Sequence, residues 1–168
     1  MVNRGYCQLM ARYNMWQNSQ LHGLLEVMDE EGLQRDRGAF FGSILATLNH
    51  ILWGDLSWIS RLDGGEPNRV GVADSVSLTA DLAGWKLARD RLDRRISLWA
   101  DGVTDAALQG ELRYFSGFTG REMHKPMGLC VVQLFNHQTH HRGQVHAMMT
   151  AAGLQAPVTD LPFMPAQA

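Results

Sequence analysis

Apolar residues recur at intervals of three and four along most of the chain, which is the spacing of amphipathic helices. The first such stretch runs from residue 6 to about residue 30, and Gly32 follows as a stop signal. The second runs from about residue 39 to residue 62 and is the least polar of the predicted helices. Its apolar stripe consists of Phe41, Ile44, Leu45, Leu48, Leu52, Leu56 and Ile59.

A third helix is predicted to begin near Ser77 or Thr79, because either side chain can cap it, and to end at Gly102. The segment 66–77 before it contains Pro67 and few periodic apolar residues. This segment is therefore interpreted as a long crossover connection that packs beside the helices.

The residues between Gly110 and Lys125 alternate apolar and polar positions in part and include Gly117 and Gly120. This pattern is typical of a short β-hairpin, and a plain loop is the alternative.

Pro126 suits the first turn of a fourth helix, which is predicted to run to about residue 152 with Gly153 as its stop. Four helices joined by one or two long crossovers predict an all-α fold, a four-helix bundle. A chain of 168 residues suits one domain, so residues 1–168 are expected to form a single bundle.

The formal net charge of −2 and the scattered basic residues give no electrostatic field that would gather phosphates, so no nucleic-acid partner is expected. The sequence shows no signal-peptide pattern and no apolar run of about 20 residues. A cytoplasmic protein without a membrane partner is therefore expected. Cys7 and Cys130 both fall among apolar helical positions and are interpreted as reduced core residues.

Three of the seven histidines lie within residues 136–144 of the fourth predicted helix. His137 and His141 stand four residues apart, so both rings rise from one face and can reach one metal ion at about 2.1 Å per bond. His140 is rotated away from that face. The alternative is that these histidines only form hydrogen bonds within the bundle.

His50 is the third candidate ligand, in the middle of the second predicted helix. It lies opposite the apolar stripe, on a face made of Ser43, Ala46, Thr47, Gly54 and Ser57. This face carries no charge, which indicates that it is covered, and small residues around a histidine leave a recess. A tight helix contact is the alternative; together with the inward His137 and His141 pair, however, His50 predicts a three-histidine site with an open coordination position.

Asp55 falls inside the apolar stripe, where a carboxylate must be paired or hydrogen-bonded. Arg142 or a histidine ring N–H is the expected partner, and both a structural and a catalytic role stay open. Asp55, Tyr114 and Gln144 are the candidates for orienting the ligands or handling protons. Cys130 is two turns from His137, about 10 Å along the helix, and is excluded as a ligand.

Three neutral imidazoles suit Zn²⁺ or Ni²⁺, with the remaining position free for water, a thiol or a substrate oxygen. The first hypothesis is an enzyme that catalyses thiol transfer or hydrolysis on a small molecule. The rival is a non-catalytic bundle that binds a metal or a small ligand such as haem, and a metal-free structural bundle is a third alternative. A di-iron carboxylate site is excluded because the chain contains no Glu-x-x-His.

The chain resembles a known family over nearly its whole length, and the histidine motif of the fourth predicted helix is the most specific part of the resemblance. The segment 48–55 (LNHILWGD) with Trp58, Arg61 and Leu62, and the later segment 135–144 (FNHQTHHRGQ), resemble the DinB family of metal-dependent proteins. The resemblance implies a four-helix bundle with up-down-down-up connections and a divalent metal held by His50, His137 and His141. It also implies a low-molecular-weight thiol as cosubstrate, because members with assigned activities include thiol-dependent transferases and a maleylpyruvate isomerase.

A homodimer is expected from the surplus of large apolar side chains, because exposed apolar patches usually mark contacts between chains. The family resemblance points the same way. The residues on which this expectation depends are Trp16, Trp53, Trp58, Trp85 and Trp99.

Overall fold

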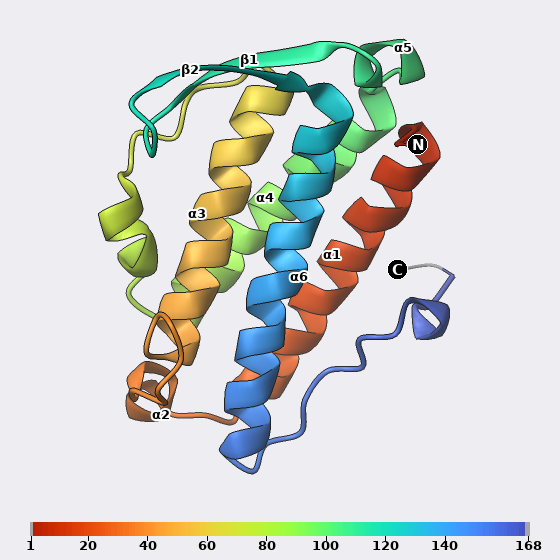
Figure 1. Cartoon of the computed structure of the whole chain (residues 1–168). Helices are drawn as coiled ribbons and strands as arrows, with labels where there is room; N and C mark the ends of the chain where they lie inside the picture. Colours follow the sequence, from red (N-terminus) through yellow and green to blue (C-terminus); the bar gives the residue numbers. More distant parts are fainter. Residues whose placement is uncertain (1, 167–168) are drawn as a thin grey trace.

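Four long helices form the body of the molecule (Figure 1): α1 (Arg4–Leu25), α3 (Ile44–Leu62), α4 (Leu82–Gly102) and α6 (Met127–Ala151). The structure is a computed structural model that describes residues 2–166. Helices α3 and α4 run in one direction, and α1 and α6 run in the other. Helix α3 packs on α6 and α4, and α1 packs on α4 and α6. The predicted four-helix bundle with up-down-down-up connections is confirmed.

Shorter elements connect and close the bundle. An antiparallel hairpin precedes α6 and lies across one end of the bundle, so the hairpin reading of this segment is confirmed over the plain loop. The two strands of the hairpin are β1 (Glu111–Ser116) and β2 (Arg121–Pro126). The other short elements are helices: α2 (Glu30–Gln34), the 3-10 helix η1 (Val72–Ser77), α5 (Asp105–Leu108) and the 3-10 helix η2 (Leu161–Phe163).

The boundaries around α2 and α3 differ from the prediction because capping side chains set them. The Asp29 carboxylate accepts a hydrogen bond from Gly32 N and begins α2, which is separate from α1. The Ser43 hydroxyl accepts one from Ala46 N and begins α3. Phe41 fits the apolar periodicity, but it lies in the loop before this cap and not on the helix.

The third long helix begins at Leu82, later than predicted, because Asp81 caps it by accepting from Gly84 N. Thr79 has another role. Its backbone N–H and its hydroxyl both donate to the side-chain oxygen of Asn49 on α3, at 3.1 and 2.7 Å. Hydrogen bonds therefore hold the crossover that contains η1 against α3, as the sequence predicted.

The interior between the helices is largely apolar and includes Cys7 and Cys130, which are buried and unpaired as predicted. Trp85 is buried and the other four tryptophans are partly buried. They do not form the exposed patch from which the homodimer was expected, and the homodimer stays a prediction. No helix among residues 2–166 is both long and apolar enough to cross a lipid bilayer.

A buried polar network links the four helices across this interior. Arg89 on α4 lies between two carboxylates, with Nη1 2.6 Å from Asp55 Oδ2 and Nη2 2.8 Å from Asp93 Oδ1. The side-chain amides of Asn14 and Asn18 on α1 donate to Asp93 at 3.0 to 3.1 Å. Burial raises the pKa of Asp55, and the adjacent Arg89 guanidinium acts in the opposite direction.

The partner of Asp55 was predicted wrongly. Arg142 on α6 donates instead to the side-chain oxygen of Asn14, and its guanidinium lies over the Tyr13 ring. Arg89 reaches Asp55 because α4 packs directly against α3. The charge in the apolar stripe is therefore compensated inside the bundle, as a buried carboxylate requires.

Replacing Arg89 by Ala should lower the free energy of unfolding by about 3–5 kcal/mol, because it leaves two buried carboxylates without their cation. The matched control is Arg95→Ala on the same helix. Arg95 pairs with Asp63 at 2.7 Å in a partly exposed position, and its loss should cost at most about 1 kcal/mol. Denaturant unfolding of both variants measures the difference, and equal losses would contradict this account.

Candidate metal centre

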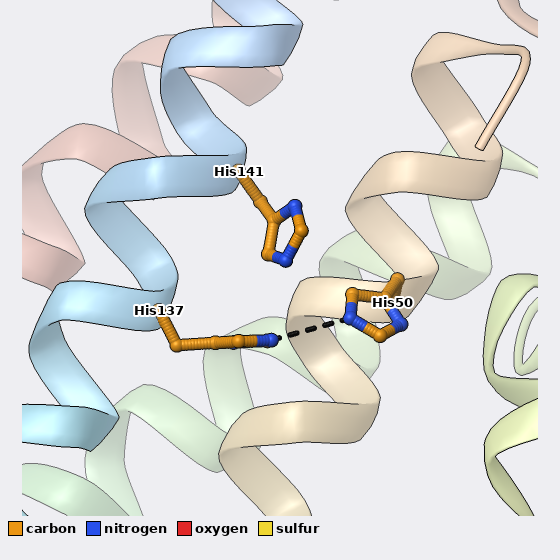
Figure 2. A group of neighbouring side chains, drawn as sticks. All are labelled: His50, His137 and His141. Atoms are coloured by element: carbon orange, nitrogen blue, oxygen red, sulfur yellow. Dashed lines mark hydrogen bonds between the residues drawn. The ribbon is translucent and has the colours of Figure 1, made fainter. Parts of the chain in front are cut away.

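Three histidine side chains converge between α3 and α6 (Figure 2). His50 comes from the middle of α3, and His137 and His141 come from successive turns of α6. One ring nitrogen from each residue lies within 4.8 Å of the others, and the Nε2 atoms of His50 and His137 are 3.2 Å apart. This group, which the sequence predicted as ligands, could hold a metal ion.

Gly54 allows the close approach of His137. It lies one turn after His50 on α3, and the His137 ring rests against its backbone. A Cβ atom at position 54 would stand 2.5 Å from His137 Cε1 and 2.8 Å from Nδ1. The charge-free face of small residues around His50 thus forms a recess that holds the ring of His137 from α6.

Two outer contacts orient the rings. His50 Nδ1 lies 2.9 Å from the hydroxyl of Ser75, a buried residue on η1, and His141 Nδ1 lies 2.9 Å from the side-chain oxygen of Gln144. An imidazole that donates from Nδ1 keeps the lone pair of Nε2 for a metal, which is the usual second contact of histidine ligands. The Nδ1 atom of His137 is buried, with no hydrogen-bond partner among the described residues.

Burial keeps the three imidazoles neutral. Together with a smaller effect of the adjacent histidines, it lowers the pKa of His50 to about 4 and that of His137 to about 3. The pKa of His141 is also lowered, mainly by burial, although the contact with Gln144 opposes this shift. At neutral pH the rings therefore offer lone pairs, which is the form that binds a metal. The donor set and its protonation state fit a divalent ion.

Aromatic side chains enclose His50. The Phe41 ring stacks on it at a centroid distance of 4.0 Å and also lies 5.4 Å from the His141 ring. Trp53 stacks on His50 at 5.6 Å. Phe41 was predicted on the apolar stripe of α3; its position in the preceding loop instead places it against the histidines.

The other predicted site residues separate into two groups. Gln144 contacts His141 and also lies 3.4 Å from the exposed His140, whose ring is not part of the converging group. Asp55 is paired with Arg89, and Tyr114 on β1 packs on Trp58. Among the described residues neither Asp55 nor Tyr114 forms a hydrogen bond with the three histidines, and a role of either in proton transfer stays a prediction.

Sequence reasoning missed Ser75 and the role of Gly54. The small-residue face around His50 contained the signal for Gly54, because an unexplained glycine on a covered helix face often permits a close contact. Ser75 gave no signal of its own. It lies in the crossover, and only the packing of η1 on α3 brings it to His50.

Replacing Gly54 by Ala should weaken metal binding by about 10–100-fold, the range seen when the support of a ligand is disturbed. The new methyl group would occupy the position of the His137 ring. Gly143→Ala on α6 is the control, because a Cβ atom there meets nothing within 4 Å. Competition with a chromophoric chelator measures the affinity, and equal affinities in the two variants would contradict the role of Gly54.

The metal-free protein should become less stable as the pH falls from about 6.5 toward 4. His50 and His137 have lowered pKa values in the folded state, so the unfolded chain takes up more protons in this range and unfolding is favoured. His137→Gln should reduce the pH dependence of the melting temperature. His124 is exposed, and His124→Gln is the control: its melting temperature should depend on pH as that of the wild type does. The same pH dependence in His137→Gln as in the wild type would contradict the prediction.

Comparisons with known proteins agree with the fold and with the family resemblance. The chain is 24% identical over 166 residues to the protein DinB of Bacillus subtilis (strain 168), covering 90% of this chain and 88% of that protein. It also resembles the crystal structure of a DinB-like protein from Bacillus cereus ATCC 10987. That likeness has a TM-score of 0.59 and 21% identity, and covers 86% of this chain and 91% of that one. The model of the DinB family matches residues 1–168, and the chain belongs to this family.

Proposed function

We propose that the protein is a metal-dependent enzyme that transfers a low-molecular-weight thiol to or from a small organic substrate. The observation that carries the proposal is the convergence of three neutral imidazoles, His50, His137 and His141, on one point. Zn²⁺ or Ni²⁺ is the proposed ion, because these ions suit imidazole donors without a thiolate or carboxylate. When bound, such an ion supplies a Lewis acid that lowers the pKa of a thiol or water beside it.

The protein's own residues hold and shield this position. Ser75 and Gln144 fix the orientation of the His50 and His141 rings through their Nδ1 atoms. Phe41 and Trp53 stack on His50 and restrict the approach of water from its side. Gly54 lets His137 complete the set. Two of the three rings are thus held by a second contact, as precise metal sites require, and His137 is positioned by packing.

Thiol transfer is favoured over hydrolysis because no carboxylate hydrogen-bonds to the three histidines among the described residues. Attack by water is commonly assisted by a general base beside the metal, such as the Glu of His-Glu-x-x-His sites. A thiol is acidic enough to ionise without such a base once its pKa is lowered. A hydrolase and a non-catalytic binding protein are the alternatives, and two experiments distinguish them from a thiol transferase.

The first experiment is metal analysis of protein purified without a histidine tag. We expect about one zinc or nickel ion per chain, and a severe loss of binding when His50, His137 or His141 is replaced by Ala. His140→Ala is the control and should cost at most about 10–100-fold in affinity, because the exposed His140 ring only packs against His141 and contacts Gln144 and is not part of the converging group. Unchanged metal content in a His137→Ala, His141→Ala double variant would contradict the site.

The second experiment compares thiol transfer with hydrolysis in the metal-loaded protein. Low-molecular-weight thiols should bind the loaded protein more tightly than the metal-free protein in calorimetry, because the lowered pKa favours the thiolate. Loss of free thiol in the presence of an electrophilic acceptor measures transfer. Ester cleavage without thiol consumption would support the hydrolase, and metal binding with neither reaction would support the binding protein.

A further inference from the structure

A cavity of about 460 Å³ lies between α3, the hairpin and the first half of α6. Its apolar walls are Trp58, Tyr114, Leu129 and Val132. Leu129 and Val132 are exposed, at 57% and 39% of their surface. The volume falls within the range of about 300–1,000 Å³ that small-molecule sites occupy. Two aromatic walls suit a flat ring.

One end of the cavity lies on the side of the histidines along α6 and α3. Gln133 lines it four residues before His137 on α6, and Trp58 lines it four residues after Gly54 on α3. Residues four apart on a helix have Cβ atoms about 6 Å from one another. The amide side chains of Gln133 and Asn136 therefore form a polar end of the cavity, one helical turn from the candidate metal centre.

The other end, at the hairpin, is positively charged. Lys125 on β2 lines the cavity, and the Arg61 guanidinium lies 4.8 Å from the Trp58 ring and 4.5 Å from the Tyr114 ring. Among the described residues neither cation forms an ion pair, and no carboxylate lines the cavity. Charge complementarity favours an anion at this end.

We propose that this cavity binds a small aromatic carboxylate. Its charged group lies at Lys125, with Arg61 behind the aromatic rings, its ring lies against Trp58, Tyr114 and Leu129, and its opposite end points past Gln133 toward the histidines. The direction of the molecule rests on the proposed function, because the reacting group would then face the metal centre. Binding itself depends only on the cavity.

The test is calorimetric titration of the full chain with 2-naphthoate, in metal-free and metal-loaded protein. The neutral 2-naphthamide has nearly the same shape and serves as the matched ligand. We expect naphthoate to bind more tightly than naphthamide. Lys125→Gln should weaken naphthoate by about 5-fold, as for a partly exposed ion pair, and leave naphthamide unchanged. Leu129→Ser should weaken both ligands.

Two control variants lie outside the cavity. Arg121→Gln removes a cation from the far end of β2, and Leu98→Ser replaces a leucine that is 74% exposed on α4. Both should bind naphthoate as the wild type does. Thermal melting of every variant identifies any that fails to fold, and because Lys125 and Leu129 are not buried, their replacement should leave the melting temperature unchanged.

Several results would overturn the proposal. These are no binding of naphthoate at millimolar concentration, equal affinity for naphthoate and naphthamide, or no effect of Lys125→Gln. A dimer in light scattering that Leu129→Ser dissociates would also overturn it, because a second copy would then cover the cavity. Naphthoate should still bind the His137→Ala, His141→Ala double variant. The naphthoate titration can therefore fail while the metal analysis succeeds, or the reverse, so the two proposals are tested separately.

Discussion

The contact between His137 and Gly54 determines how close α6 can lie to α3, and the candidate site depends on that spacing. With any side chain at position 54, the His137 ring would have to shift from its present position beside His50. The same close packing removes water from the imidazoles and lowers their pKa values. Proximity and neutrality, the two properties that a metal requires of these rings, therefore have one physical cause.

The buried ion pair beside this contact fixes the rotation of α3. Asp55 follows Gly54 directly, and successive residues on a helix point about 100° apart. With Asp55 held by Arg89 of α4, Gly54 must face α6. A buried ion pair adds little net stability compared with apolar packing, but breaking one is costly. The main effect of the network is therefore to disfavour packings in which α3 is rotated differently about its axis.

The sequence predicted what local spacing determines and missed what packing determines. The four-residue spacing of His137 and His141 identified the pair, and the charge-free face of α3 identified His50. Periodicity alone extended α3 back over Phe41, since an apolar residue in a loop can match a helical pattern by chance. Ser75 and the Arg89 partner of Asp55 could not be predicted, because which elements face each other is a tertiary property.

The candidate metal centre and the cavity beside the hairpin are built on elements with different constraints. The histidines and Gly54 lie on long helices, where a small shift would separate the ligands. Tyr114 and Lys125 lie on a two-stranded hairpin, which packs on the bundle through buried Leu112. A two-stranded hairpin is marginal by itself and depends on such packing. Its outward residues can therefore change without moving the three histidines, so the helices hold the candidate metal centre while the hairpin lines the neighbouring cavity.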